Sequence, residues 1–176
     1  SAQVTVGGST GADGSYTTLA QAFTAINGTD QTGNNIVITL SAGTTETTTA
    51  LLNAGNYTSV NIYPTVTGVI ITGNLAAPLI DLDGADNVTI DGRVNITGVG
   101  KDMIIDNTSS AATTGTSTIR FINEATGNRI QYCLLKGSET ATASGILFFS
   151  TTTGTTGNNG NIIDNNDITS SADASR

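Results

Sequence analysis

Residues 79–92 constrain the fold of this chain more than any other stretch. They read Leu-Ile-Asp-Leu-Asp-Gly-Ala-Asp-Asn-Val-Thr-Ile-Asp-Gly, with alternating apolar runs at 79–82 and 88–90 around a polar turn at 83–87. Alternation of this kind predicts half-buried strands, and Asp, Gly and Asn favour the bend between them. The predicted core residues here are Ile80, Leu82, Val88 and Ile90.

The same strand–turn–strand pattern recurs twice downstream. Residues 119–122 lead through 123–127 to 128–132, and residues 146–149 lead through a Thr/Gly/Asn loop to 161–164. Irregular periods between 20 and 50 residues are typical of solenoids or propellers. A propeller should be richer in aromatic residues than the 5% found here. The pattern therefore predicts an all-β solenoid whose stacked coils carry Ile, Leu and Val ladders. Aligning Asn87, Asn128 and Asn161 brings Ile90, Ile130 and Ile163 together within a residue or so.

A single amphipathic helix is predicted at residues 16–27. Its apolar stripe consists of Leu19, Ala22, Phe23 and Ile26, Thr17 or Ser15 can cap its start, and Gly28 ends it. Such a helix can cover the open end of a sheet stack. We expect one domain over residues 1–176, with a cap at 1–35 and coils at 36–176. Residues 168–176 look like a loop without a closing element, so we expect the natural chain to continue beyond Arg176.

Several of these segments resemble a known family. Residues 16–23, Tyr-Thr-Thr-Leu-Ala-Gln-Ala-Phe, resemble the capping helix of pectate-lyase-like right-handed parallel β-helices. Residues 79–92, 117–123 and 145–150 are similar to successive coils of large secreted surface proteins of the Bacteroidetes group. The resemblance implies a right-handed β-helix, type IX secretion and an extracellular or cell-surface role as an adhesin or matrix protein.

Composition excludes several classes of function. The net charge is −8 with only six Lys and Arg, which argues against nucleic acid and anionic membranes as partners. The absence of His excludes His-based catalysis, metal ligation and pH switching. No apolar run is long enough to insert into a membrane. The only cysteine, Cys133, is expected to be a buried, unreactive residue of the alternating run 130–135.

Asp81, Asp83, Asp86 and Asp91 form the densest acidic group. Asp81, Asp83 and Asp86 are the calcium candidates, although their spacing is neither an EF-hand loop nor a calcium-binding nonapeptide. The competing interpretation is a solvated turn and an outward strand face, because Ile80 and Leu82 should point inward. We expect no catalytic residue, no resident metal and no cofactor, with calcium as the alternative.

The same carboxylates could act as the paired acids of a glycoside hydrolase. They could also belong to a polysaccharide lyase if an Arg or Lys lay nearby to act as the base. Arg93, Lys101, Arg120 and Lys136 are available, but none lies in a recognisable catalytic motif. Arg120 is predicted instead to pair with Glu124 or with an Asp on the next coil.

Two low-complexity features allow other interpretations. The Thr runs at 44–49 and 151–156 suggest an ice-binding surface. Ice binding needs a Thr array at one fixed place in each coil, and loops between the strands explain these runs better. The Gly-rich residues 7–14 lack the Gly-Lys-Ser/Thr ending of a phosphate loop and are predicted to be a plain loop.

The sequence therefore favours a non-enzymatic extracellular structural or adhesin-type module, able to self-associate into a surface or matrix filament or to continue as the same β-helix. The alternative is a β-helix that binds or degrades polysaccharide.

Overall fold

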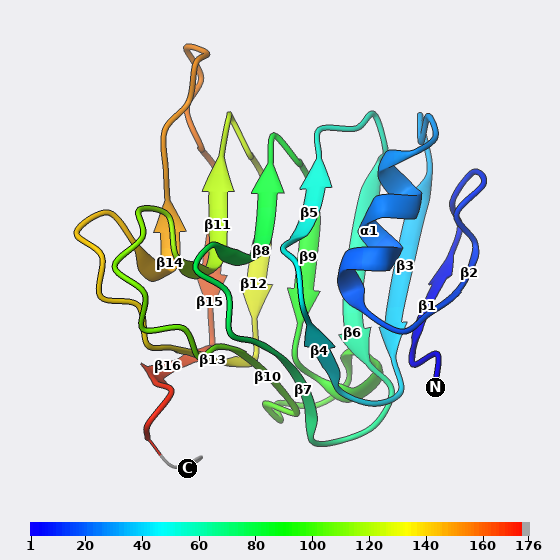
Figure 1. The fold of residues 1–176 in the computed structure, drawn as a ribbon. Coiled ribbons are helices and arrows are strands. Elements are labelled where there is room, and N and C mark those ends of the chain that lie inside the picture. The colour runs from blue at the N-terminus through cyan, green and yellow to red at the C-terminus, as the bar shows by residue number, and fades with distance from the viewer. Residues whose placement is uncertain (174–176) are drawn as a thin grey trace.

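The computed structural model describes residues 1–173, and in that part the chain is mostly β-sheet, with parallel strands in three sheets and one short α-helix (Figure 1). The helix is α1 (Leu19–Asn27), and a 3-10 turn, η1, covers Val94–Ile96. The strands are β1 (Val4–Gly7), β2 (Gly14–Tyr16), β3 (Asn35–Leu40), β4 (Thr44–Glu46), β5 (Ala50–Asn53), β6 (Ser59–Pro64), β7 (Val69–Gly73), β8 (Pro78–Asp83), β9 (Val88–Asp91), β10 (Met103–Asn107), β11 (Ser117–Ile122), β12 (Arg129–Gln131), β13 (Cys133–Gly137), β14 (Gly145–Phe149), β15 (Ile162–Asp164) and β16 (Asp167–Ser170).

From β3 onward, consecutive strands enter the three sheets in turn. The sheet orders are β15-β12-β9-β6-β3-β1-β2, β16-β13-β10-β7-β4 and β14-β11-β8-β5. Each strand thus pairs in parallel with the strand three places further along the chain. We call one strand from each sheet, such as β6, β7 and β8, a triplet. Successive triplets lie side by side, so residues at matching places in them meet across the sheets.

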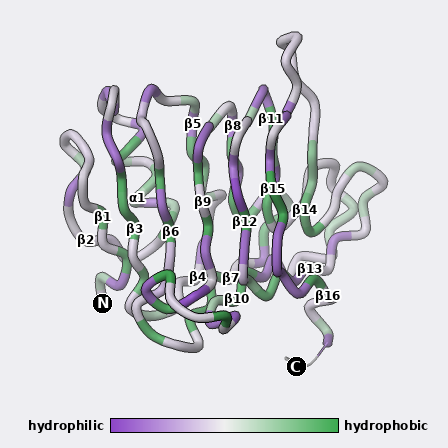
Figure 2. The backbone as a smooth tube through the Cα atoms, turned by 180° about the vertical axis from the view of Figure 1, so that it is seen from behind, coloured by the Kyte–Doolittle hydropathy of each residue, from purple (hydrophilic) through white to green (hydrophobic). Residues whose placement is uncertain are grey.

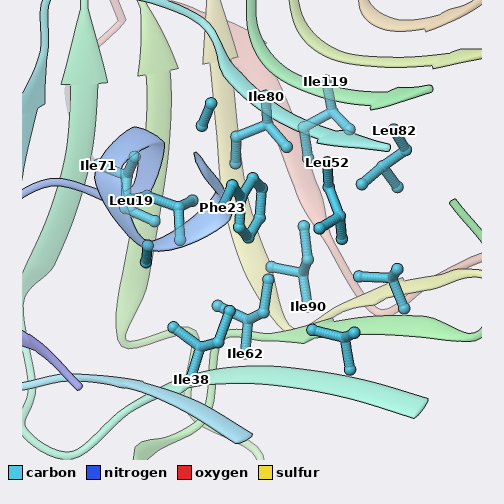
Figure 3. Close-up of a cluster of buried hydrophobic side chains, with 14 of the residues drawn as sticks. Leu19, Phe23, Ile38, Leu52, Ile62, Ile71, Ile80, Leu82, Ile90 and Ile119 are labelled. Carbon is cyan, nitrogen blue, oxygen red and sulfur yellow. The ribbon is translucent and has the colours of Figure 1, made fainter. Parts of the chain in front are cut away.

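The core consists of ladders of inward-pointing side chains. In each ladder, residues at matching places in successive triplets pair across one sheet. In the first sheet, Ile38, Ile62, Ile90, Ile130 and Ile163 are paired one after another. Figure 3 shows side chains from all three sheets and α1 meeting in the centre. The four predicted core residues at 80, 82, 88 and 90 are completely buried, which confirms that part of the sequence analysis.

The helix is shorter than predicted. It begins at Leu19 rather than at residue 16, and its cap is Thr18, whose hydroxyl accepts from the Gln21 N–H at 3.2 Å. Tyr16 belongs instead to β2, where it pairs with Val4 of β1. The predicted apolar stripe is buried, and Gly28 ends the helix as expected.

Two further predictions need correction. The run 130–135 is not one strand, because Tyr132 takes a left-handed conformation (φ 52°) and turns the chain from β12 into β13 of another sheet. Residues 168–170, expected to belong to a loop, are part of β16, in which Ile168 pairs with Leu135. Residues 171–173 of that predicted loop form a turn and a bend, and residues 174–176, with Arg176, lie outside the described residues.

Candidate functional site

Asp81 lies on the outward side of β8, but it is not a solvated residue. Its two oxygens accept from Arg120 Nε at 2.9 Å and Nη2 at 2.7 Å, and the residue is only 4% exposed. Asp81 and Arg120 are register partners on β8 and β11. Arg120 therefore pairs with an aspartate of the preceding triplet and not with Glu124 or an aspartate of the next one, which corrects the prediction. The hydrogen bonds that Arg120 donates to Asp81 raise the pKa of its guanidinium. A two-point pair of this kind fixes both side chains.

Asp83 and Asp86 have partners of their own. Asp83 Oδ1 accepts from Asn123 Nδ2 at 2.6 Å, and Asp86 Oδ1 accepts from the Thr126 N–H at 2.7 Å. Among residues 1–173, no group of three or more acidic or Cys side chains is placed to hold a metal ion. Calcium ligation needs several oxygens that converge on one point. Calcium binding by Asp81, Asp83 and Asp86 therefore stays a prediction from the sequence. In the structure these three side chains do not form a metal site.

Asp91, the last residue of β9, forms a polar cluster with Arg93 and Gln131. Its carboxylate accepts from Arg93 Nη2 at 2.6 Å and from Gln131 Nε2 at 2.7 Å, while the Arg93 guanidinium lies 4.3 Å from the centre of the Tyr132 ring. Burial, with 1% exposure, acts to raise the pKa of Asp91. The hydrogen bonds from Arg93 and Gln131 outweigh burial and hold that pKa below its ordinary value. The expectation of a solvated aspartate is thus wrong at this position as well.

The geometry of these clusters suits structure better than acid catalysis. A general acid must carry a proton near neutral pH, whereas Asp91 is held as an anion by a fixed cation. Both oxygens of Asp81 are likewise occupied by Arg120. Of the other candidate cations, Lys101 pairs with Asp167 at 2.9 Å, and Lys136 is buried with its ammonium donating to the Asp173 carbonyl at 2.6 Å. These four cations therefore serve contacts between neighbouring strands and loops.

Two cavities lie beside α1, and neither is lined by Asp81, Asp83, Asp86 or Asp91. One of about 330 Å³ is lined by the C-terminal end of the helix and by the loop 53–57. The other, of about 470 Å³, lies between the helix surface, Tyr16 and the Thr run at residues 47–48. Neither is lined by Asp, Glu, Lys or Arg apart from Asp30 in the first. Asp30 already accepts from the Thr32 N–H and hydroxyl.

Cys133 is fully buried in the core, and burial raises the pKa of its thiol far above the ordinary value. A thiol that stays protonated is a poor nucleophile. The buried, unreactive role predicted for Cys133 agrees with this environment.

The chain matches no family model, and comparisons with curated proteins and with solved structures found no significant match. No helix in residues 1–173 is long and apolar enough to cross a membrane.

Glu46 is one buried polar residue that sequence reasoning missed. It stands in the Thr run 44–49, yet it is buried at 2% exposure, and its carboxylate accepts the N–H groups of Leu19 at 2.8 Å and Ala20 at 3.0 Å. A lone acid among threonines carries no local signal for such a role, because its partners are 26 and 27 residues away.

Proposed function

We propose that the chain is a right-handed parallel β-helix that serves as a non-enzymatic, extracellular structural module of the adhesin or matrix type. The observation that carries the proposal is the register. Three strands per triplet and parallel pairing at a spacing of three strands are what a β-helix requires. The inward-pointing ladders extend through this register, and on the outward side Arg120 of β11 neutralises Asp81 of the neighbouring strand β8.

The chemistry of the surface supports a structural role over a catalytic one. Asp81 is committed to Arg120 of the neighbouring strand β11, and Asp91 to Arg93, two residues along the chain, and to Gln131 of β12. The low fraction of charged residues, 11%, leaves much of the surface to hydroxyl and amide groups. Export to the cell surface, through type IX secretion, follows from the family resemblance and is part of the same proposal.

The β-helix is tested by crosslinking outward positions that share one ladder. Asn61 pairs with Thr89, and Thr89 with Arg129. Neighbouring parallel strands lie about 4.8 Å apart, within reach of a disulfide, whereas two strand spacings are about 10 Å. The double variant Asn61→Cys/Thr89→Cys should oxidise to an intramolecular disulfide. The matched control Asn61→Cys/Arg129→Cys should not, and the opposite result would refute the register.

The non-enzymatic role is tested against its alternative, a β-helix that binds or degrades polysaccharide. Purified protein is applied to a glycan array and incubated with neutral and acidic polysaccharides in a reducing-sugar assay. We expect neither saturable binding nor new reducing ends. Cleavage that is lost in Asp81→Asn would overturn the proposal. Saturable binding without cleavage would replace it with a carbohydrate-binding function.

A further inference from the structure

Residues 1–92 carry negative charge without any basic side chain. They contain seven Asp and Glu and no Lys or Arg, because all six basic residues lie further along the chain. Folding compensates some of these acids: Asp81 and Asp91 each meet an arginine, and Glu46 accepts the first N–H groups of α1. Asp30, by contrast, forms no ion pair within the described residues. Its negative charge is therefore left to solvent or to a bound cation.

Asp30 lines the cavity of about 330 Å³ between the C-terminal end of α1 and the loop after β5 (Figure 1). Among the described residues, it is the only charged one in that lining. Its Oδ1 accepts from the Thr32 hydroxyl at 2.7 Å, whereas no described residue donates to its Oδ2. In Figure 2 the chain is hydrophilic at this edge, where β3 and β6 begin. The neutral side chains that carry oxygen in the same lining include Asn27, Thr29, Asn53 and Asn56.

The position of Asp30 is electrostatically unfavourable for a carboxylate. Helix α1 ends three residues before it, and the last turn of the helix holds no basic residue. The carbonyl groups at a helix C-terminus carry partial negative charge, which favours cations and disfavours anions. Burial and the nearby Asp86 carboxylate also raise the pKa of Tyr57 in the same lining, so a second anion lies close to the cavity. Departures from a local rule of this kind are typical of functional sites.

The cavity is held in shape by contacts between its walls. Asn27 joins the helix to β5, since its Nδ2 donates to the Leu51 carbonyl at 2.8 Å and its Oδ1 accepts the Asn53 N–H at 3.0 Å. The Gly33 N–H donates to the Asn56 carbonyl at 2.9 Å and ties the loop after β5 to the segment before β3. A polar cavity that is already formed needs little reorganisation to bind a ligand.

We propose that this cavity is a Ca²⁺ site in which Asp30 Oδ2 is the anionic ligand and neighbouring amide, hydroxyl and carbonyl oxygens complete the shell. Ca²⁺ accepts a variable set of oxygen ligands, whereas Mg²⁺ demands a compact octahedron and dehydrates reluctantly. A single carboxylate gives weak binding, so we expect a Kd on the order of 1 mM, as in extracellular calcium modules. The inference does not rest on the proposed structural role, and it places calcium away from Asp81, Asp83 and Asp86.

The test is a titration of the isotopically labelled 176-residue chain with CaCl₂, followed by amide NMR signals up to about 20 mM Ca²⁺. Ionic strength is kept constant with NaCl, because added salt by itself screens the net charge of −8. We expect saturable shifts centred on residues 27–31 and 53–57. The melting temperature should rise by about 3–6 °C at about 10 mM Ca²⁺, and less with Mg²⁺ at the same concentration.

Asp30→Asn removes the anionic ligand and should raise the Kd for Ca²⁺ by about tenfold or more. Asp102→Asn is the matched control, since it removes the same charge from the loop between β9 and β10, outside the cavity lining, and should leave the Kd unchanged. Circular dichroism confirms that each variant is folded. The absence of saturable shifts, equal effects of Mg²⁺ and Ca²⁺, or an unchanged Kd in Asp30→Asn would overturn the inference. Each of these results leaves the crosslinking and polysaccharide tests intact.

Discussion

Glu46 offers the sharpest test of how α1 is fixed to the sheets. Its buried carboxylate accepts two N–H groups from the first turn of the helix, Leu19 N–H at 2.8 Å and Ala20 N–H at 3.0 Å. The first N–H groups of a helix have no intrahelical partner, and its N-terminus carries partial positive charge. Replacing Glu46 with Ala therefore removes a buried anion from a site built for one.

The magnitude follows from the groups left behind. Each buried N–H without a partner costs about 1–3 kcal/mol. Loss of the favourable charge at the helix terminus adds about 0.5–2 kcal/mol. Glu46→Ala should lower the free energy of unfolding by about 2.5–8 kcal/mol, a large part of the roughly 5–15 kcal/mol of a typical domain. Glu46→Gln keeps one acceptor oxygen and should cost about 2 kcal/mol.

The assay is urea unfolding followed by circular dichroism, with the midpoint and the slope fitted separately. Thr18→Ala is the control in the same helix turn, because Thr18 makes a single exposed capping bond to Gln21 and should cost about 1 kcal/mol. If Glu46→Ala lies within 1 kcal/mol of Thr18→Ala at an unchanged slope, the carboxylate does not anchor the helix and the reasoning fails.

Three further predictions concern the corner between β9 and β10, and the core. The pKa of Asp91 is lowered in the folded protein, so its contribution is complete above the unfolded pKa of about 3.9 and is lost as pH falls through the lower folded value. Asp91→Asn should reduce stability at pH 7 and flatten the acid limb of a stability–pH profile; an unaltered limb would contradict the ion pair. A Cβ on Gly92 would lie 1.9 Å from the Tyr132 carbonyl oxygen, so Gly92→Ala should cost about 3 kcal/mol in urea unfolding. Gly7→Ala, whose Cβ would meet nothing within 4 Å, should be nearly neutral, and equal costs for the two would refute the close approach. Cys133 should resist a thiol reagent in the native state and react fully in urea, whereas fast native labelling would show that the core is open.

The amino-acid sequence alone determined those helices and strands whose buried face follows from the spacing of nearby apolar residues. Alternation at residues 79–92 fixed which side chains of β8 and β9 face inward, because successive residues of a strand point to opposite faces. The spacing of Leu19, Ala22, Phe23 and Ile26 likewise predicted the buried face of α1, while its start was wrong by three residues because β2 pairs with β1 over residue 16.

Tertiary structure decided which outward side chains meet. A strand's register depends on the length of the connection before it, and these connections range from residues 150–161 between β14 and β15 to Tyr132 alone between β12 and β13. The periodicity of a sequence determines which face of a strand each side chain lies on, but not which residue of the neighbouring strand it contacts. The burial of Asp81 by Arg120 therefore followed only from the assembled sheets, as did the capping of α1 by Glu46.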